Sequence, residues 1–148
     1  MYDDWFANAT VVAATIAAVS LSVLVHYEGL LFMSRRLARP EGMRRVKVLY
    51  AIFGVVALHV SEIWIFGLTY WMLLQWPGCG QLGGEPLTHL FDAVYFSATT
   101  FSTLGYGDIA PLGPIRFLAG TESLIGLVLI TWSASFTYLE MEKFWRSS

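Results

Sequence analysis

The sequence predicts an all-α membrane protein with three transmembrane helices and one short re-entrant helix. Of its 148 residues, 56% are hydrophobic and only 14% are charged, which is too apolar for a soluble domain of this size. Three apolar runs are each long enough to cross a bilayer, since a span needs about 20 residues. A shorter helical segment that ends in glycines lies between the second and third runs. These features predict three spans and one re-entrant loop.

The remaining composition argues against several classes of protein. A net charge of −2 gives no indication of a nucleic-acid partner. The single cysteine, Cys79, excludes an intrachain disulfide and a zinc site made of several cysteines. We find no phosphate-binding loop, no dinucleotide fingerprint and no Ser/His/Asp spacing, so we expect neither an enzyme nor an organic cofactor.

Residues 1–33 are predicted to contain the first transmembrane helix. The chain begins with Asp3 and Asp4, and residues 7–25 then carry no charge. A signal peptide has a basic start and an apolar core of about 7–15 residues. The acidic start and the longer apolar run therefore indicate a true span.

Residues 34–47 are predicted to form a basic cytoplasmic loop. Six of the nine basic residues lie in it: Arg35, Arg36, Arg39, Arg44, Arg45 and Lys47. By the positive-inside rule this loop faces the cytoplasm, which puts the N-terminus outside and the C-terminus inside. A voltage sensor needs arginines within a span, so we favour a solvated or lipid-contacting loop. Anionic lipid is expected at Arg35, Arg36, Arg39, Arg44 and Arg45.

Residues 48–74 are predicted to form the second span, which carries two ionisable residues. His59 and Glu62 share one helical face, and Glu62 lies about 21 Å into the span, near the bilayer centre. The pair is open to three interpretations: a pH sensor, half of a metal site with His26 or Glu28, or a polar contact that locks the first helix onto the second. We favour the polar contact, because His26 and Glu28 lie nearer the cytoplasmic end.

Residues 75–87 are rich in glycine and proline and are predicted to form an extracellular turret. Within it, Cys79 either pairs with the same cysteine of another copy or stays a free thiol. Residues 88–102 are predicted to form the short helix, with Thr88 as its N-cap. That helix is too short to cross the bilayer.

The segment that follows, residues 103–108, reads Thr-Leu-Gly-Tyr-Gly-Asp. Gly105 and Gly107 can adopt backbone angles that other residues avoid, so the carbonyls here can all turn one way. Pro111 and Pro114 argue against a simple continuation as helix or strand. Irregular backbone at membrane depth is tolerated only where it is buried in protein or lines water.

Residues 100–108 resemble the selectivity filter of potassium channels, and the resemblance extends over residues 47–138. It implies a homotetramer in which four such loops replace the hydration shell of K⁺. By position it implies ion binding at Thr103, Leu104, Gly105, Tyr106 and Gly107. It further implies filter support from Thr99, Thr100, Asp108 and Glu122.

Two residues depart from the usual pattern of this family. Leu104 stands where valine is most frequent, and its extra methylene should leave the carbonyl ring intact. Thr99 stands where some members carry a glutamate that hydrogen-bonds towards the filter aspartate. We therefore expect filter inactivation, rather than selectivity, to differ from that of other members.

Residues 115–139 are predicted to form the third span, and residues 140–148 a cytoplasmic tail. Glu122 lies about 10 Å deep, where we expect it to support the filter by hydrogen bonding, since contact with lipid would be costly. Gly126 matches the gating-hinge glycine of the family, and it either lets the helix bend or makes room for the short helix. The candidates for the lining of the cavity share one face: Leu127, Ile130, Ala134 and Tyr138.

These features together predict a potassium-selective channel in the cell membrane, with a prokaryotic inner membrane as the expected location. The sequence leaves five alternatives for gating: the filter itself, pH, lipid, tension, or a leak channel that needs no stimulus. One rival is a non-selective cation channel, which would require a change at Tyr106. The others are an accessory subunit of larger channels and a membrane enzyme or metal-handling protein built on His26, Glu28, His59 and Glu62.

Overall fold

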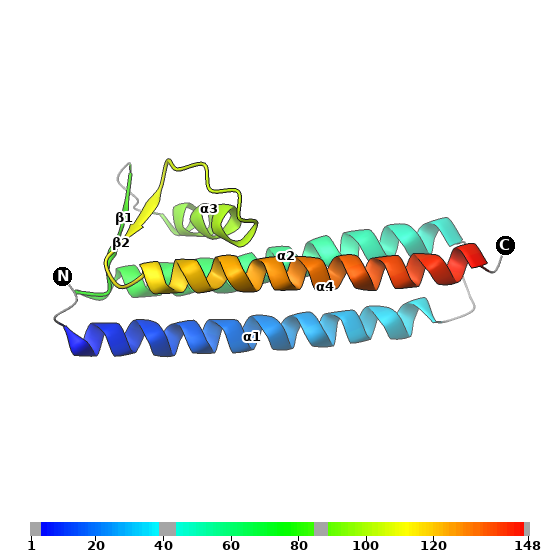
Figure 1. The fold of residues 1–148 in the computed structure, drawn as a ribbon, viewed down its shortest axis with the longest axis horizontal. Coiled ribbons are helices and arrows are strands. Elements are labelled where there is room, and N and C mark those ends of the chain that lie inside the picture. The colour runs from blue at the N-terminus through cyan, green and yellow to red at the C-terminus, as the bar shows by residue number, and fades with distance from the viewer. Residues whose placement is uncertain (1–3, 39–43, 85–88, 147–148) are drawn as a thin grey trace.

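Three long helices lie side by side in the computed structural model, which describes residues 4–38, 44–84 and 89–146. They are α1 (Trp5–Leu37), α2 (Arg44–Leu74) and α4 (Arg116–Arg146), and the two chain ends lie at opposite ends of the bundle (Figure 1). Each of the three is long and apolar enough to cross a membrane. The predicted class, an all-α membrane protein with three spans, is confirmed.

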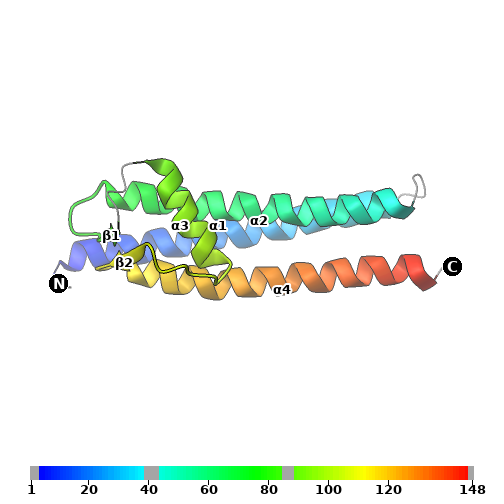
Figure 2. The same ribbon diagram turned by 90° about the horizontal axis from the view of Figure 1, so that it is seen from above.

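A short helix and a small sheet cover one end of the bundle. The helix α3 (Leu90–Phe101) lies on the side of α2 and α4 that faces away from α1 (Figure 1), and it crosses both obliquely (Figure 2). Gly67 permits this close approach, since a Cβ there would lie 2.8 Å from the Cα of Val94. The loop after α3 returns over the helices to the start of α4 (Figure 2).

The sequence did not predict the sheet, in which β1 (Gln81–Gly83) pairs antiparallel with β2 (Ala110–Leu112). Pro111 lies within β2 opposite Leu82, so the prediction that this proline prevents a simple continuation as a strand was wrong. A two-stranded ladder has free edges on both sides, where a residue without an N–H group removes no hydrogen bond. The pairing of the two strands connects the predicted turret to the segment that follows residues 103–108.

The helices next to the basic loop are longer than predicted. Arg35 and Arg36 belong to the last turn of α1, and α2 already begins at Arg44. Cations stabilise a helix C-terminus, and the Arg36 guanidinium also lies 5.0 Å from the centre of the Phe32 ring. The predicted loop of residues 34–47 therefore shrinks at both ends, while Arg39 lies outside the described residues.

Two other predicted boundaries also move. The short helix begins at Leu90 with His89 as its N-cap, two residues later than predicted, and the His89 N–H donates to Asp92 Oδ2 over 3.1 Å. Thr88, the predicted N-cap, lies outside the described residues. The helix α4 continues to Arg146 through most of the predicted tail, where Lys143 pairs with Glu140 over 2.6 Å.

The core lies between the helices at the end of the bundle that carries α3. Its largest fully buried apolar side chains come from α2, α3 and α4 and include Phe66, Tyr70, Phe101, Leu118 and Leu129. On α1 the buried residues follow the helical repeat as Ala7, Val11, Thr15, Ala18, Ser22 and His26. This packing fixes α3, and with it the loop that follows α3, against the long helices.

Candidate functional site

The sign of the backbone angle φ alternates along the loop after α3. The φ angles of Thr103, Gly105 and Gly107 are 59°, 52° and 83°, whereas Leu104 and Tyr106 between them have negative φ. In a regular strand successive carbonyls point to opposite sides. Positive φ at every second residue breaks this pattern, so successive carbonyls can turn to one side. The backbone from Thr103 to Gly107 is thus irregular, with positive φ at every second residue.

Thr103 is the one non-glycine residue with positive φ in the described part of the chain. A β-branched residue in this region is a strong outlier, and the left-handed conformation costs about 1–2 kcal/mol. The last turn of α3 holds the loop in this form, because Thr103 N–H donates to Thr100 O over 2.9 Å and Gly105 N–H donates to Thr99 O over 3.1 Å. Backbone strain of this kind is characteristic of functional sites.

Thr99 and Thr100 therefore contact the loop through their carbonyl groups. The Thr99 hydroxyl donates to Phe96 O over 3.0 Å, within its own helix. The Thr100 carbonyl also accepts a hydrogen bond of 3.3 Å from the Ser123 hydroxyl on α4. The predicted support residues on α3 thus lie next to the loop.

Tyr95, which the sequence analysis did not include among the site residues, holds the far end of the loop. Its hydroxyl donates to Asp108 Oδ2 over 2.8 Å, and its ring lies parallel to that of Tyr106 within 2°, with centroids 6.5 Å apart. The hydrogen bond to the Asp108 carboxylate raises the pKa of Tyr95 above its usual value. The sequence signal that could have identified this residue is a tyrosine on the short helix, four residues before Thr99.

Glu122 is fully buried and links three helices. Its carboxyl group lies 2.6 Å from the Tyr70 hydroxyl of α2 and 2.6 Å from the Ser97 hydroxyl of α3. Ser97 Oγ is also 2.9 Å from Ile63 O, so one hydroxyl faces two oxygen partners. The sequence predicted hydrogen bonding by Glu122 but identified neither Tyr70 nor Ser97.

Gly126 lies directly against the last residue of α3. A Cβ at this position would overlap the carbonyl oxygen of Phe101 and would lie 2.9 Å from its carbonyl carbon. The helix α4 continues through Gly126 without a break. This geometry supports close packing as a role of Gly126, and its role as a hinge stays a prediction.

The predicted cavity residues lie on an exposed face of α4. Leu127, Ile130, Ala134 and Tyr138 are all exposed in the single chain, whereas Leu129 is fully buried. The loop of residues 103–108 is open in the same way, with Leu104 58% and Tyr106 67% exposed. Large apolar side chains of this kind require cover from lipid or from other chains.

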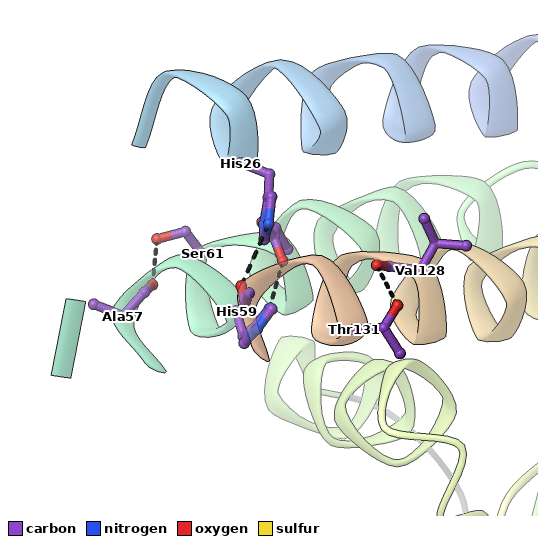
Figure 3. A network of polar contacts seen from close by, with 8 residues as sticks. His26, Ala57, His59, Ser61, Val128 and Thr131 are labelled. Atoms are coloured by element: carbon purple, nitrogen blue, oxygen red, sulfur yellow. Dashed lines mark hydrogen bonds and ion pairs between the residues drawn. The ribbon is translucent and has the colours of Figure 1, made fainter. Parts of the chain in front are cut away.

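Three of the four ionisable residues considered for the spans come together where α1 meets α2. Glu62 Oε1 lies 2.7 Å from His26 Nδ1, and Glu62 Oε2 lies 2.9 Å from His59 Nδ1 (Figure 3). Glu28 is exposed and takes no part in the cluster. The polar contact between the first and second helices is present, but the argument that His26 lies too near the cytoplasm was wrong.

His26 and Glu62 can meet because α1 and α2 end at different heights along the bundle axis. Lys47 on α2 reaches back to donate to Leu37 O over 3.2 Å, so α2 begins beyond the end of α1. Glu62 lies about 22 Å from Lys47, and His26 lies about 16 Å from Leu37. The lysine side chain spans most of the difference between these two distances. His26 and Glu62 therefore lie at the same height in the bundle.

Cys79 is buried, with 1% of its surface exposed. Its carbonyl accepts a hydrogen bond of 3.0 Å from Ile115 N–H, which fixes the turret to the start of α4. Burial, together with the nearby charge of Asp4, raises the pKa of the thiol. In this conformation the sulfur is not available for a disulfide with another copy, and the free thiol is the form that the structure holds.

A family model described as "Ion channel" matches residues 45–142, well over half of the chain. The chain belongs to this ion channel family. The match supports the resemblance to potassium channel pores noted in the sequence, and it identifies a membrane protein. It begins in the first turn of α2, so α1 lies outside the matched domain.

Two curated relatives carry the name Protein LctB. The protein from Geobacillus stearothermophilus is 26% identical, over 54% of this chain and 87% of that protein. The protein from Bacillus caldotenax is 30% identical, over 53% of this chain and 63% of that protein. No solved structure matches the chain.

Proposed function

We propose that this ion channel is selective for K⁺ and conducts it passively through a pore formed by four copies of the chain. The observation that carries the proposal is the alternation of positive φ at Thr103, Gly105 and Gly107 within a sequence that resembles a potassium channel filter. Such a backbone supports the proposal, because it allows successive carbonyls to turn to one side, as a filter that replaces the water around K⁺ requires.

Each residue of the loop has a role in this proposal. The carbonyls of residues 103–106 and the Thr103 hydroxyl coordinate the conducted K⁺. Gly107 turns the chain away at the outer mouth, where Asp108 is held by Tyr95. The C-terminal end of α3 carries partial negative charge, which favours a cation beside it.

The exposed surface of one chain supports assembly into a tetramer. A single chain has one loop, and a closed ring of carbonyls needs several. Leu104, Tyr106 and the exposed face of α4 that contains Leu127 and Tyr138 are large apolar surfaces on one copy. In the proposed homotetramer the filter residues pack against neighbouring copies, and the α4 faces line the cavity.

The orientation follows from charge in the same proposal. Arg35, Arg36 and Arg45 are exposed at the end of the bundle opposite α3. The positive-inside rule places that end in the cytoplasm and the filter outside, in the cell membrane of a prokaryote. Anionic lipid headgroups are the partners that we propose for these arginines.

The test is the flux of K⁺ and Na⁺ through the purified chain in liposomes, compared with Gly105→Ala. We expect K⁺ flux well above Na⁺ flux, and its loss in Gly105→Ala, because φ at Gly105 is 52° and alanine there costs about 1–2 kcal/mol per copy. Gly120→Ala is the matched control, since Gly120 has a helical backbone and no atom within 4 Å of an added Cβ. Equal K⁺ and Na⁺ flux would refute selectivity, and a monomer in the membrane would refute the tetramer.

A further inference from the structure

We propose that His26, His59 and Glu62 bind a divalent transition-metal ion of the Zn²⁺ type at the junction of the three spans. One potential ligand atom from each residue lies within 4.8 Å of the other two. The site combines α1, which lies outside the matched channel domain, with α2, which lies within it. The inference goes beyond conduction and concerns a cluster behind the filter.

The donor set suits zinc. Two imidazole nitrogens and one carboxylate oxygen are ligands that Zn²⁺ uses at about 2.0–2.2 Å in tetrahedral sites. Such bonds separate the ligand atoms by about 3.4 Å, whereas Glu62 oxygens now lie 2.7 and 2.9 Å from His26 and His59. Small side-chain rotations therefore suffice to admit the ion, and a fourth position stays open for another ligand.

The charge of the cluster also favours a cation. The Glu62 carboxyl group is fully buried between helices, and its ion-pair partners within the described residues are the two histidines. As metal ligands both imidazoles are neutral, so the carboxylate carries the only charge of the donor set, and a buried charge without a partner charge is costly. A divalent ion bound to all three residues balances that charge.

A group next to the cluster orients His26 as a metal ligand. His26 Nε2 lies 3.4 Å from the Ser133 hydroxyl of α4. When Nδ1 binds a metal, the ring proton is on Nε2, and metal-binding histidines generally donate that proton to a neighbouring acceptor. The ring also lies 5.2 Å from the ring of Trp132, so α4 fixes both its direction and its place.

The cluster has a route of entry and lies close to the pore. His59 retains 17% side-chain exposure, whereas His26 and Glu62 have none, so the ion enters past His59. Figure 3 shows His26 pointing from α1 towards His59 on α2. The His59 ring lies 5.8 Å from the ring of Phe101, the last residue of α3. A bound metal would therefore join α1 to α2 beside the last residue of α3, after which the proposed filter begins.

The first experiment measures Zn²⁺ binding by the full chain in detergent or lipid nanodiscs after removal of metal. Calorimetry should give one Zn²⁺ per chain, and Co²⁺ in its place should show the visible absorption of a four-coordinate site. The variants His26→Gln, His59→Gln and Glu62→Gln should each weaken binding at least tenfold. Binding needs no flux assay, so its failure is distinct from failure of the proposed function.

Two matched controls separate the site from background binding. His89→Gln removes the remaining histidine of the chain, which lies at the start of α3. Ser22→Ala removes a buried hydroxyl that has no partner in the described residues, one turn before His26 on α1. Both should keep wild-type affinity.

The outcomes decide the proposal in either direction. Loss of binding in the three cluster variants alone supports the site. Binding that persists in those variants, or that disappears in His89→Gln, overturns it. If the cluster variants do not assemble, the Co²⁺ spectrum of the wild-type chain decides, and the absence of a four-coordinate spectrum overturns the metal site.

Discussion

The hydroxyl of Tyr95 donates a hydrogen bond of 2.8 Å to the carboxylate of Asp108, across the whole length of the filter loop. The two residues are 13 positions apart in the sequence. The near end of the loop is held by backbone bonds from Thr103 and Gly105 to the last turn of α3. The short helix therefore holds both ends of a strained segment.

Tyr95→Phe should shorten the time for which the filter conducts. The variant keeps the ring that lies parallel to Tyr106 and removes the hydrogen bond to Asp108. A hydrogen bond to a charged group contributes about 1.5–3 kcal/mol when buried, but this one is exposed, so we expect a two- to tenfold faster decay of current. Recordings in planar bilayers measure it, and Tyr50→Phe on α2 is the control. A decay equal to wild type would show that Asp108 is held by other means.

High pH should break the same contact. The pKa of Tyr95 is raised by its hydrogen bond to Asp108, so the contact is fully present below the pKa of about 10 of a free tyrosine. It is lost as pH rises through the higher pKa of the folded chain. Steady K⁺ flux up to about pH 10 and a decline above it are expected in wild type. The decline should be absent in Tyr95→Phe, which has no phenol to ionise.

Glu122→Gln should preserve the assembled protein, whereas Glu122→Leu should not. Ser97 has one hydroxyl proton but faces two oxygens, Ile63 O at 2.9 Å and Glu122 Oε1 at 2.6 Å. A glutamine satisfies all of these groups, because its amide donates to Ser97 Oγ while its carbonyl accepts from the Tyr70 hydroxyl.

Leucine at position 122 leaves the buried Tyr70 hydroxyl without its partner, at a cost of about 1–3 kcal/mol, while the Ser97 hydroxyl keeps Ile63 O. Thermal unfolding of the detergent-solubilised protein measures the difference between the variants. Glutamine at this position should unfold near the wild-type temperature and leucine well below it. An equally large loss in Glu122→Gln would mean that the charge itself is required.

Local sequence patterns predicted the three spans and the short helix, because each depends on residues that are contiguous. The contacts that the sequence missed join distant segments. Tyr70 and Glu122 are 52 residues apart, and His26 and Ser133 are 107 apart. Helical periodicity tells which side of a helix is polar but gives neither the partner helix nor the level at which two helices meet. The level of α1 against α2 was misjudged for this reason.

Cys79 should react slowly with thiol reagents in the folded protein. Its side chain is buried, and burial raises the pKa of the thiol, so both access and the thiolate fraction fall at pH 8. We expect modification by a maleimide to be at least tenfold slower than after unfolding in SDS. Mass spectrometry measures it, and Gln81→Cys at the exposed start of β1 is the control. Fast modification in the native protein would mean that the turret opens.

Gly126→Ala separates close packing from hinge motion at the middle of α4. The added Cβ overlaps the carbonyl oxygen of Phe101, so α3 and α4 must move apart. Overpacking of this kind costs about 1–3 kcal/mol, and the filter loop begins directly after α3. We expect a lower unfolding temperature and loss of K⁺ flux in the same variant. If Gly126 acts as a hinge alone, the variant should unfold at the wild-type temperature and show altered channel opening. Gly120→Ala is the control for an added alanine on α4, because its Cβ meets no atom within 4 Å.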